Sequence, residues 1–163
     1  MNNKSYLFFF SLLLLIGVFY LYNKYCVAPA INLPALELRS LNQQPYALEQ
    51  LKGQKVAICM AASWCVNCID ELNELARLDS ASLGGIRVVV ISDEPFEKIE
   101  RFQEKHGYPF LFLKLTQPFA AIGINSIPTS YLLNTRFQVV KQSVGALQWS
   151  DPSTLKYLKT LMD

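Results

Sequence analysis

The chain has 163 residues, of which 52% are hydrophobic, and a formal net charge of +2 at neutral pH. This length fits one folded domain with an appendage, and the small net charge gives no indication of a nucleic-acid-binding surface. Because the hydrophobic excess is concentrated at the start, we divide the chain into an N-terminal segment with a linker (residues 1–30) and one domain (residues 31–163).

The N-terminal segment contains an uncharged apolar run of 17 residues, Tyr6 to Tyr22, between Lys4 and Lys24. This is near the lower limit for a helix that spans a bilayer core of about 30 Å. A cleaved signal peptide is the alternative, because Ala28-Pro29-Ala30 resembles a cleavage site. Its apolar region is usually only about 7–15 residues long, so we favour an uncleaved anchor. Signal-like N-termini usually direct the downstream domain out of the cytoplasm, and we therefore expect this domain to lie outside it.

The rest of the chain alternates between strand-like and helix-like patterns. Continuous apolar runs at 54–61 and 86–92 predict buried, parallel strands. Asp93-Glu94-Pro95 predicts a helix start with an acid near the N-cap, and Gly107 predicts its end. The order predicts an α/β domain with a central mixed sheet and helices on both faces. The remaining predicted strands are 35–39, 108–115, 130–134 and 137–144, and the predicted helices are 65–78, 95–106, 117–122 and one that follows Ser150-Asp151-Pro152.

A Cys-x-x-Cys pair, Cys65 and Cys68, stands where the strand at 54–61 turns into a helix. Free N–H groups and the helix dipole stabilise a thiolate at a helix start. Cysteines so placed can have a pKa of roughly 3.5–7.5 instead of about 8.5. We expect Cys65 to face solvent and attack a disulfide. Cys68 lies four residues before Leu72, on the buried stripe, and is expected to resolve the mixed disulfide.

Half of a structural zinc site is the alternative interpretation of this pair. Such a site needs a second pair of Cys or His ligands at matching spacing. The remaining candidates, Cys26, Cys59 and His106, do not form such a pair. The sequence therefore favours redox chemistry that requires no metal and no organic cofactor.

Ala62-Ser63-Trp64-Cys65-x-x-Cys68, with Ile127-Pro128-Thr129 further on, resembles the thioredoxin fold. More narrowly, the chain is similar to the membrane-anchored TlpA/ResA-type thiol–disulfide oxidoreductases of bacteria, whose LxxLKG-like segment matches residues 48–53. The likeness covers residues 31–163. It implies a thioredoxin-like domain on a single-pass anchor in the bacterial inner (cytoplasmic) membrane, facing the periplasm or exterior. A soluble periplasmic form, cleaved near Ala30, is the alternative.

The resemblance also implies roles for individual residues. Pro128 would follow a cis peptide bond and face the cysteine pair, where Ile127 and Thr129 would help to bind a substrate peptide beside Trp64. Glu71 stands three residues after the second cysteine, and the resemblance implies that it accepts a proton from Cys68. A solvated glutamate on the helix surface is the alternative.

Two positions depart from the family pattern. Cys59 stands where thioredoxin carries a buried aspartate, and we expect it to be a small core residue. Val66-Asn67 separates the cysteines, where relatives often carry proline, so the reduction potential cannot be transferred.

The function implied by the resemblance is reduction of disulfides in substrate proteins, for instance in cytochrome c maturation, with electrons from a membrane donor. Two alternatives on the same fold remain open. One is an oxidant that introduces disulfides, and the other is a copper metallochaperone or assembly factor.

Overall fold

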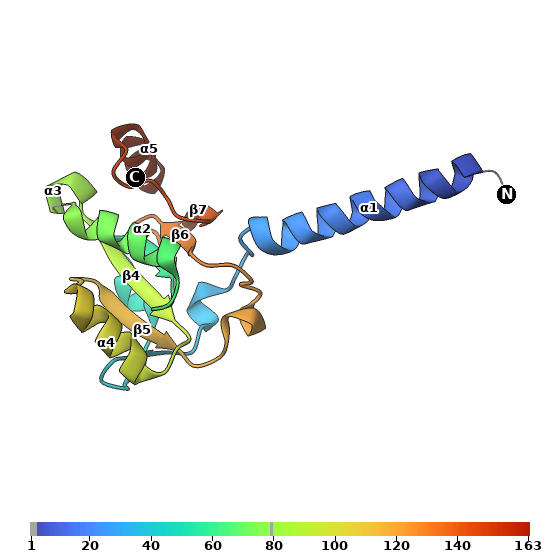
Figure 1. Ribbon diagram of the computed structural model, residues 1–163. Helices are drawn as coiled ribbons and strands as arrows, with labels where there is room; N and C mark the ends of the chain where they lie inside the picture. The colour runs from blue at the N-terminus through green and yellow to red at the C-terminus, as the bar shows by residue number, and fades with distance from the viewer. Residues whose placement is uncertain (1–2, 79) are drawn as a thin grey trace.

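A computed structural model of the chain describes residues 3–78 and 80–163. The first helix, α1 (Asn3–Cys26), extends away from the rest of the molecule (Figure 1). Its part from Phe8 to Cys26 is long and apolar enough to cross a membrane, and none of that part is buried. This agrees with the apolar run predicted from Tyr6 to Tyr22; residues 1 and 2 of the predicted N-terminal segment lie outside the described residues.

The domain is built on one sheet of seven strands, in which the strands β3, β4 and β5 are parallel to one another and the remaining pairs are antiparallel. The predicted mixed sheet is therefore confirmed. In spatial order the strands are β2 (Pro45–Tyr46), β1 (Leu38–Ser40), β5 (Leu111–Leu115), β4 (Ile86–Ser92), β3 (Lys55–Met60), β6 (Thr129–Leu133) and β7 (Val139–Val144).

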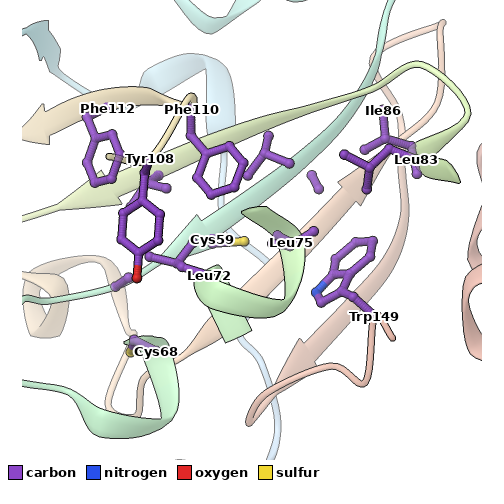
Figure 2. Close-up of a cluster of buried hydrophobic side chains, with 14 of the residues drawn as sticks. Cys59, Cys68, Leu72, Leu75, Leu83, Ile86, Tyr108, Phe110, Phe112 and Trp149 are labelled. Atoms are coloured by element: carbon purple, nitrogen blue, oxygen red, sulfur yellow. The ribbon is translucent and has the colours of Figure 1, made fainter. Parts of the chain in front are cut away.

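Both faces of the sheet are covered, but by different kinds of helix. The α-helices pack on one face, where Figure 2 shows Leu72 and Leu75 lying close to Cys59 of β3, with Trp149 beside them. Short 3-10 helices cover the other face around Ile58, Ile91 and Leu113. The first group is α2 (Val66–Arg77), α3 (Ser80–Leu83), α4 (Phe96–His106) and α5 (Pro152–Met162), and the second is η1 (Leu33–Ala35), η2 (Leu48–Leu51) and η3 (Phe119–Ile122).

Most element boundaries follow the sequence patterns, and the largest shifts in a predicted strand occur next to prolines. β1 begins at Leu38 rather than at residue 35, because Pro34 takes the first turn of η1. β5 begins at Leu111, three residues later than predicted, after Pro109 has interrupted the extended chain. The short helix α3 was not predicted.

Asp93 and Glu94 lie just before the N-cap of α4, as predicted, but neither side chain caps the helix. Pro95 occupies the N-cap position, and no side chain caps the helix there. The side chains of Asp93 and Glu94 turn away from α4 instead: Asp93 accepts a hydrogen bond from the Phe119 N–H at 2.9 Å, and Glu94 bonds Ser63.

The linker that follows α1 is hydrogen-bonded to strands β6 and β7 of the domain. The Ala28 carbonyl accepts a hydrogen bond from the Gln142 side chain at 3.0 Å, and the Pro29 carbonyl accepts one from the Tyr131 hydroxyl at 2.8 Å. Ala28 itself is buried. The ordered domain therefore reaches back almost to the end of α1.

We predict that deleting residues 1–26 leaves the free energy of unfolding of the domain unchanged, because α1 packs on nothing from Phe8 onward. Deleting residues 1–30 should lower it by about 1–3 kcal/mol, through loss of the two linker hydrogen bonds. Urea denaturation followed by circular dichroism measures both. Equal destabilisation by the two deletions would contradict this account of the linker.

Candidate functional site

The site lies where the central strand β3 runs into α2. The strand's hydrogen bonding continues past its end, because the Ala61 N–H donates to the Ile91 carbonyl at 3.0 Å. A turn follows, closed by the Cys65 N–H and the Ala62 carbonyl at 3.1 Å. Cys65 is then the N-cap of α2. The predicted strand–Cys-x-x-Cys–helix arrangement is thus present.

The two cysteines form a disulfide in this structure, with their Cα atoms 5.2 Å apart. Cys65 Sγ also accepts a hydrogen bond from the Cys68 N–H at 3.2 Å, so the sulfur itself caps the helix. Cys65 is 7% exposed and Cys68 is 1% exposed. The order of exposure is the expected one, but Cys65 is itself nearly buried rather than openly facing solvent. Trp64 and Val66, on either side of it, are 70% and 68% exposed.

The loop before β6 closes the site from the other side. The peptide bond between Ile127 and Pro128 is cis, as predicted, and the Ile127 carbonyl oxygen lies 3.8 Å from Cys65 Sγ. Thr129 is buried, and its hydroxyl donates to the Ser126 carbonyl at 2.7 Å. The Thr129 hydroxyl therefore stabilises its own loop by a hydrogen bond within it.

Glu71 is 1% exposed, so the alternative of a solvated surface glutamate is wrong. One oxygen, Oε1, accepts hydrogen bonds from Trp149 Nε1 at 3.0 Å, from the Leu147 N–H at 3.2 Å and from Ser130 Oγ at 3.5 Å. Burial raises the pKa of Glu71 above its usual 4.5, and these donors oppose the rise. Glu71 thus ties α2 to the segment before α5, and its buried carboxyl group holds a proton more readily than an exposed glutamate does.

Cys59 is a free, buried thiol on β3, as expected for a core cysteine. Burial, followed by the nearby charge of Glu71, raises the pKa of Cys59 well above its usual 9.0. Cys59 is thereby kept protonated and poorly nucleophilic at neutral pH.

The residue that sequence reasoning missed is Glu94, which is buried at the end of β4. Its Oε2 accepts a hydrogen bond from the Ser63 N–H at 2.6 Å, and its Oε1 accepts one from Ser63 Oγ at 2.9 Å. Lys114 Nζ donates to the Glu94 carbonyl at 2.9 Å. Glu94 therefore holds the turn that leads into Cys65. In the sequence its position after a strand and before Pro95 suggested only a helix cap.

In the described part of the chain, no group of three or more His, Cys, Asp or Glu side chains is placed to hold a metal ion. A metal-holding role would therefore rest on the two sulfurs of Cys65 and Cys68.

Comparison with known proteins finds relatives of this chain. Residues 28–158 match the family model described as Redoxin. The thiol-disulfide oxidoreductase ResA of Geobacillus thermodenitrificans is 26% identical over 134 residues, which cover 78% of this chain and 76% of that protein.

Solved structures support the fold. StoA from Bacillus subtilis superposes with a TM-score of 0.59 at 22% identity, covering 83% of this chain and 100% of that one. A thiol:disulfide interchange protein of the thioredoxin family from Chlorobium tepidum gives a TM-score of 0.62 at 19% identity, with 83% and 100% coverage. The thioredoxin-like fold expected from the sequence is confirmed.

We predict that Glu71→Gln becomes more stable relative to the wild type as the pH rises. Because burial raises the Glu71 pKa in the folded state, the favourable contribution of the protonated acid is complete below about pH 4.5 and is lost as the pH rises through the raised pKa. Glutamine does not titrate. The difference should change by up to about 1.4 kcal/mol per pH unit. Urea denaturation of the oxidised protein between pH 4.5 and 8 measures it, with Glu49→Gln on the surface as control.

We predict that Glu94→Gln loosens the turn before Cys65. The amide offers a weaker acceptor to the Ser63 N–H, so about 1–3 kcal/mol of stability should be lost. Hydrogen exchange at the Ser63 amide, followed by NMR, should be faster than in the wild type. The exposed Glu97→Gln, three residues away, is the control and should leave the Ser63 exchange rate unchanged. An unchanged Ser63 exchange rate in Glu94→Gln would refute the positioning role.

Proposed function

Since the chain belongs to the Redoxin family and is a thioredoxin-like thiol–disulfide oxidoreductase, we propose that its Cys65–Cys68 dithiol reduces disulfides of substrate proteins outside the cytoplasm. The observation that carries the proposal is the position of Cys65 Sγ, which accepts the Cys68 N–H at the start of α2. A negative charge on this sulfur would be stabilised by the same N–H and by the helix dipole.

The proposed reaction has two steps, each of which exchanges one S–S bond for another. The Cys65 thiolate attacks a substrate disulfide, forms a mixed disulfide and releases the other substrate sulfur as a thiolate, which takes up a proton. Cys68 then loses its proton and attacks Cys65 Sγ, which releases the second substrate sulfur. Two electrons pass to the substrate, and Cys65 and Cys68 end as the disulfide seen in this structure.

We assign the proton acceptor of the second step to Glu71. It follows Cys68 by one helical turn, it is buried, and burial raises its pKa, which makes the carboxylate a stronger base. Its bonds to Trp149 and Leu147 fix its orientation.

We assign substrate binding to the surface around Cys65. The exposed ring of Trp64 offers an apolar contact, and the Ile127 carbonyl beside the sulfur is available to an incoming peptide backbone. Pro128 and Thr129 shape this loop, with the Thr129 hydroxyl holding it through Ser126.

The apolar, unburied α1 supports attachment to a bacterial inner membrane, with the domain on the periplasmic or outer side. A reductase there needs a membrane donor that returns two electrons and two protons to the Cys65–Cys68 disulfide. Cytochrome c maturation is the physiological setting that we propose, because it consumes reduced thiols in that compartment.

We predict that Cys65 of the reduced full-length chain, in neutral detergent and on a Cys26→Ser background, reacts with iodoacetamide at pH 7 faster than the same thiol in urea. Cys68→Ser should accumulate a mixed disulfide with an oxidised peptide, whereas Cys65→Ser should not. Cys59→Ser serves as control and should behave as its parent. A folded Cys65 that reacts no faster than the unfolded one would contradict the proposal.

The direction of electron flow is tested by equilibration with glutathione. A potential near that of thioredoxin, about −270 mV, supports reduction, whereas a value near −120 mV would assign the protein to the introduction of disulfides instead.

A further inference from the structure

The charges on α4 are sorted onto two flanks of the helix. Three cations and three acids follow the same spacing of three and four residues, which places each set along one side. Ile99 and Phe102 face the core between the flanks. The cations are Lys98, Arg101 and Lys105, and the acids, each one residue earlier, are Glu97, Glu100 and Glu104.

The cationic flank borders a pocket of about 350 Å³ beside the active-site turn. Ser63 and Ile69 line it from the α2 side, and Phe102 and His106 line it from α4. Figure 1 shows α2 and α4 on the same side of the sheet. Tyr108, which follows the end of α4, donates a hydrogen bond from its hydroxyl to the Asn73 side chain of α2 at 2.9 Å. The pocket therefore combines apolar walls with a positively charged rim.

This pocket is adjacent to the reactive sulfur along the chain and in space. Ser63 precedes Cys65 by two residues and is held by Glu94. The Ile69 N–H donates to the Cys65 carbonyl at 3.0 Å. A polypeptide whose cysteine is joined to Cys65 could thus place its neighbouring residues over the pocket.

None of the three cations forms an ion pair among the described residues, although Glu97 and Glu104 stand within one helical turn of Arg101. Lys98, Arg101 and Lys105 are exposed, and the ion pair found among those residues joins Lys55 to Asp163 elsewhere. Among the described residues, no acidic side chain lines the pocket. Asp70 follows Ile69 in the sequence, but it is exposed and does not line the pocket. The protein therefore leaves a positive surface unpaired beside its nucleophile, although its overall charge is only +2.

We propose that this surface, formed by Lys98, Arg101 and Lys105 with Ile69 and Phe102, selects substrate proteins whose reactive cysteine is flanked by an acidic and apolar segment. The proposal rests on the proposed function and adds a substrate class to it. Carboxylates would meet the cations at the rim, and an apolar side chain would cover Ile69 and Phe102. Charges at an interface rim act mainly on the association rate, so selection should appear in the second-order rate constant for reaction with the peptide and weaken with salt.

The test uses two oxidised peptides that carry the same internal disulfide and one leucine, and that differ only in three glutamates replaced by glutamines. The reduced full-length chain, in phosphatidylcholine nanodiscs, is mixed with each peptide, and peptide thiols are counted with time. We expect the acidic peptide to react about 3- to 10-fold faster at low ionic strength, with the preference lost near 1 M salt.

A matched pair of triple variants isolates the surface. Lys98→Gln with Arg101→Gln and Lys105→Gln should abolish the preference, so that the acidic peptide reacts no faster than the glutamine peptide. Lys52→Gln with Arg87→Gln and Arg136→Gln removes the same charge from exposed positions at the opposite end of the sheet, and should keep the preference.

Each other outcome overturns the proposal in a distinguishable way. Equal rates with the two peptides leave the reductase function intact and remove the selectivity. Loss of the preference in both triple variants assigns it to net charge. Rates that respond only when phosphatidylglycerol replaces phosphatidylcholine assign the surface to lipid. No reaction with either peptide overturns the proposed function itself.

Discussion

The geometry of the cysteine pair centres on one contact, in which the Cys65 sulfur accepts the Cys68 N–H at the point where β3 becomes α2. The contact can be maintained because both elements are held firmly. β3 lies between β4 and β6 in the sheet, and Leu72 and Leu75 anchor α2 in the core. A sulfur at the end of a rigid strand and the start of a rigid helix meets the same donor in every reaction cycle, which is the preorganisation that redox chemistry at a thiol needs.

Two buried acids, Glu71 and Glu94, are linked to the segments on either side of this contact. Each accepts hydrogen bonds from a different segment of the chain. Burying a carboxylate is costly unless donors replace its water. Glu71 receives them from Trp149 and Leu147, which ties α2 to the segment before α5. Glu94 receives them from Ser63, which ties the active-site turn to the end of β4. The same bonds that make these acids tolerable in the interior also fix the two sides of the cysteine pair.

The sequence alone could predict the features that are local or that the family pattern carries. The apolar runs located β3 and β4, the cysteine spacing located the site, and Ile127-Pro128-Thr129 pointed to the cis bond. The sequence did not reveal contacts between residues that are far apart in the chain. Glu94 bonds a residue 31 positions away, so its acid next to Pro95 resembled an ordinary helix cap. Trp149 reaches Glu71 across 78 positions, which no periodicity reveals. The charge sorting on α4 is visible in its spacing, but its orientation toward α2 depends on topology.

That orientation results from the handedness of the chain. β3, β4 and β5 are parallel neighbours in this order, and right-handed crossovers place both connecting helices on the same face of the sheet. One flank of α4 must therefore lie toward the start of α2, whatever its residues are. The cap and the buried acids are the groups to which we assign control of the sulfur's reactivity, whereas the exposed residues of that flank make no hydrogen bond to either sulfur. Substitutions at Lys98, Arg101 or Lys105 can thus alter which protein arrives at Cys65 without altering the thiol–disulfide exchange itself.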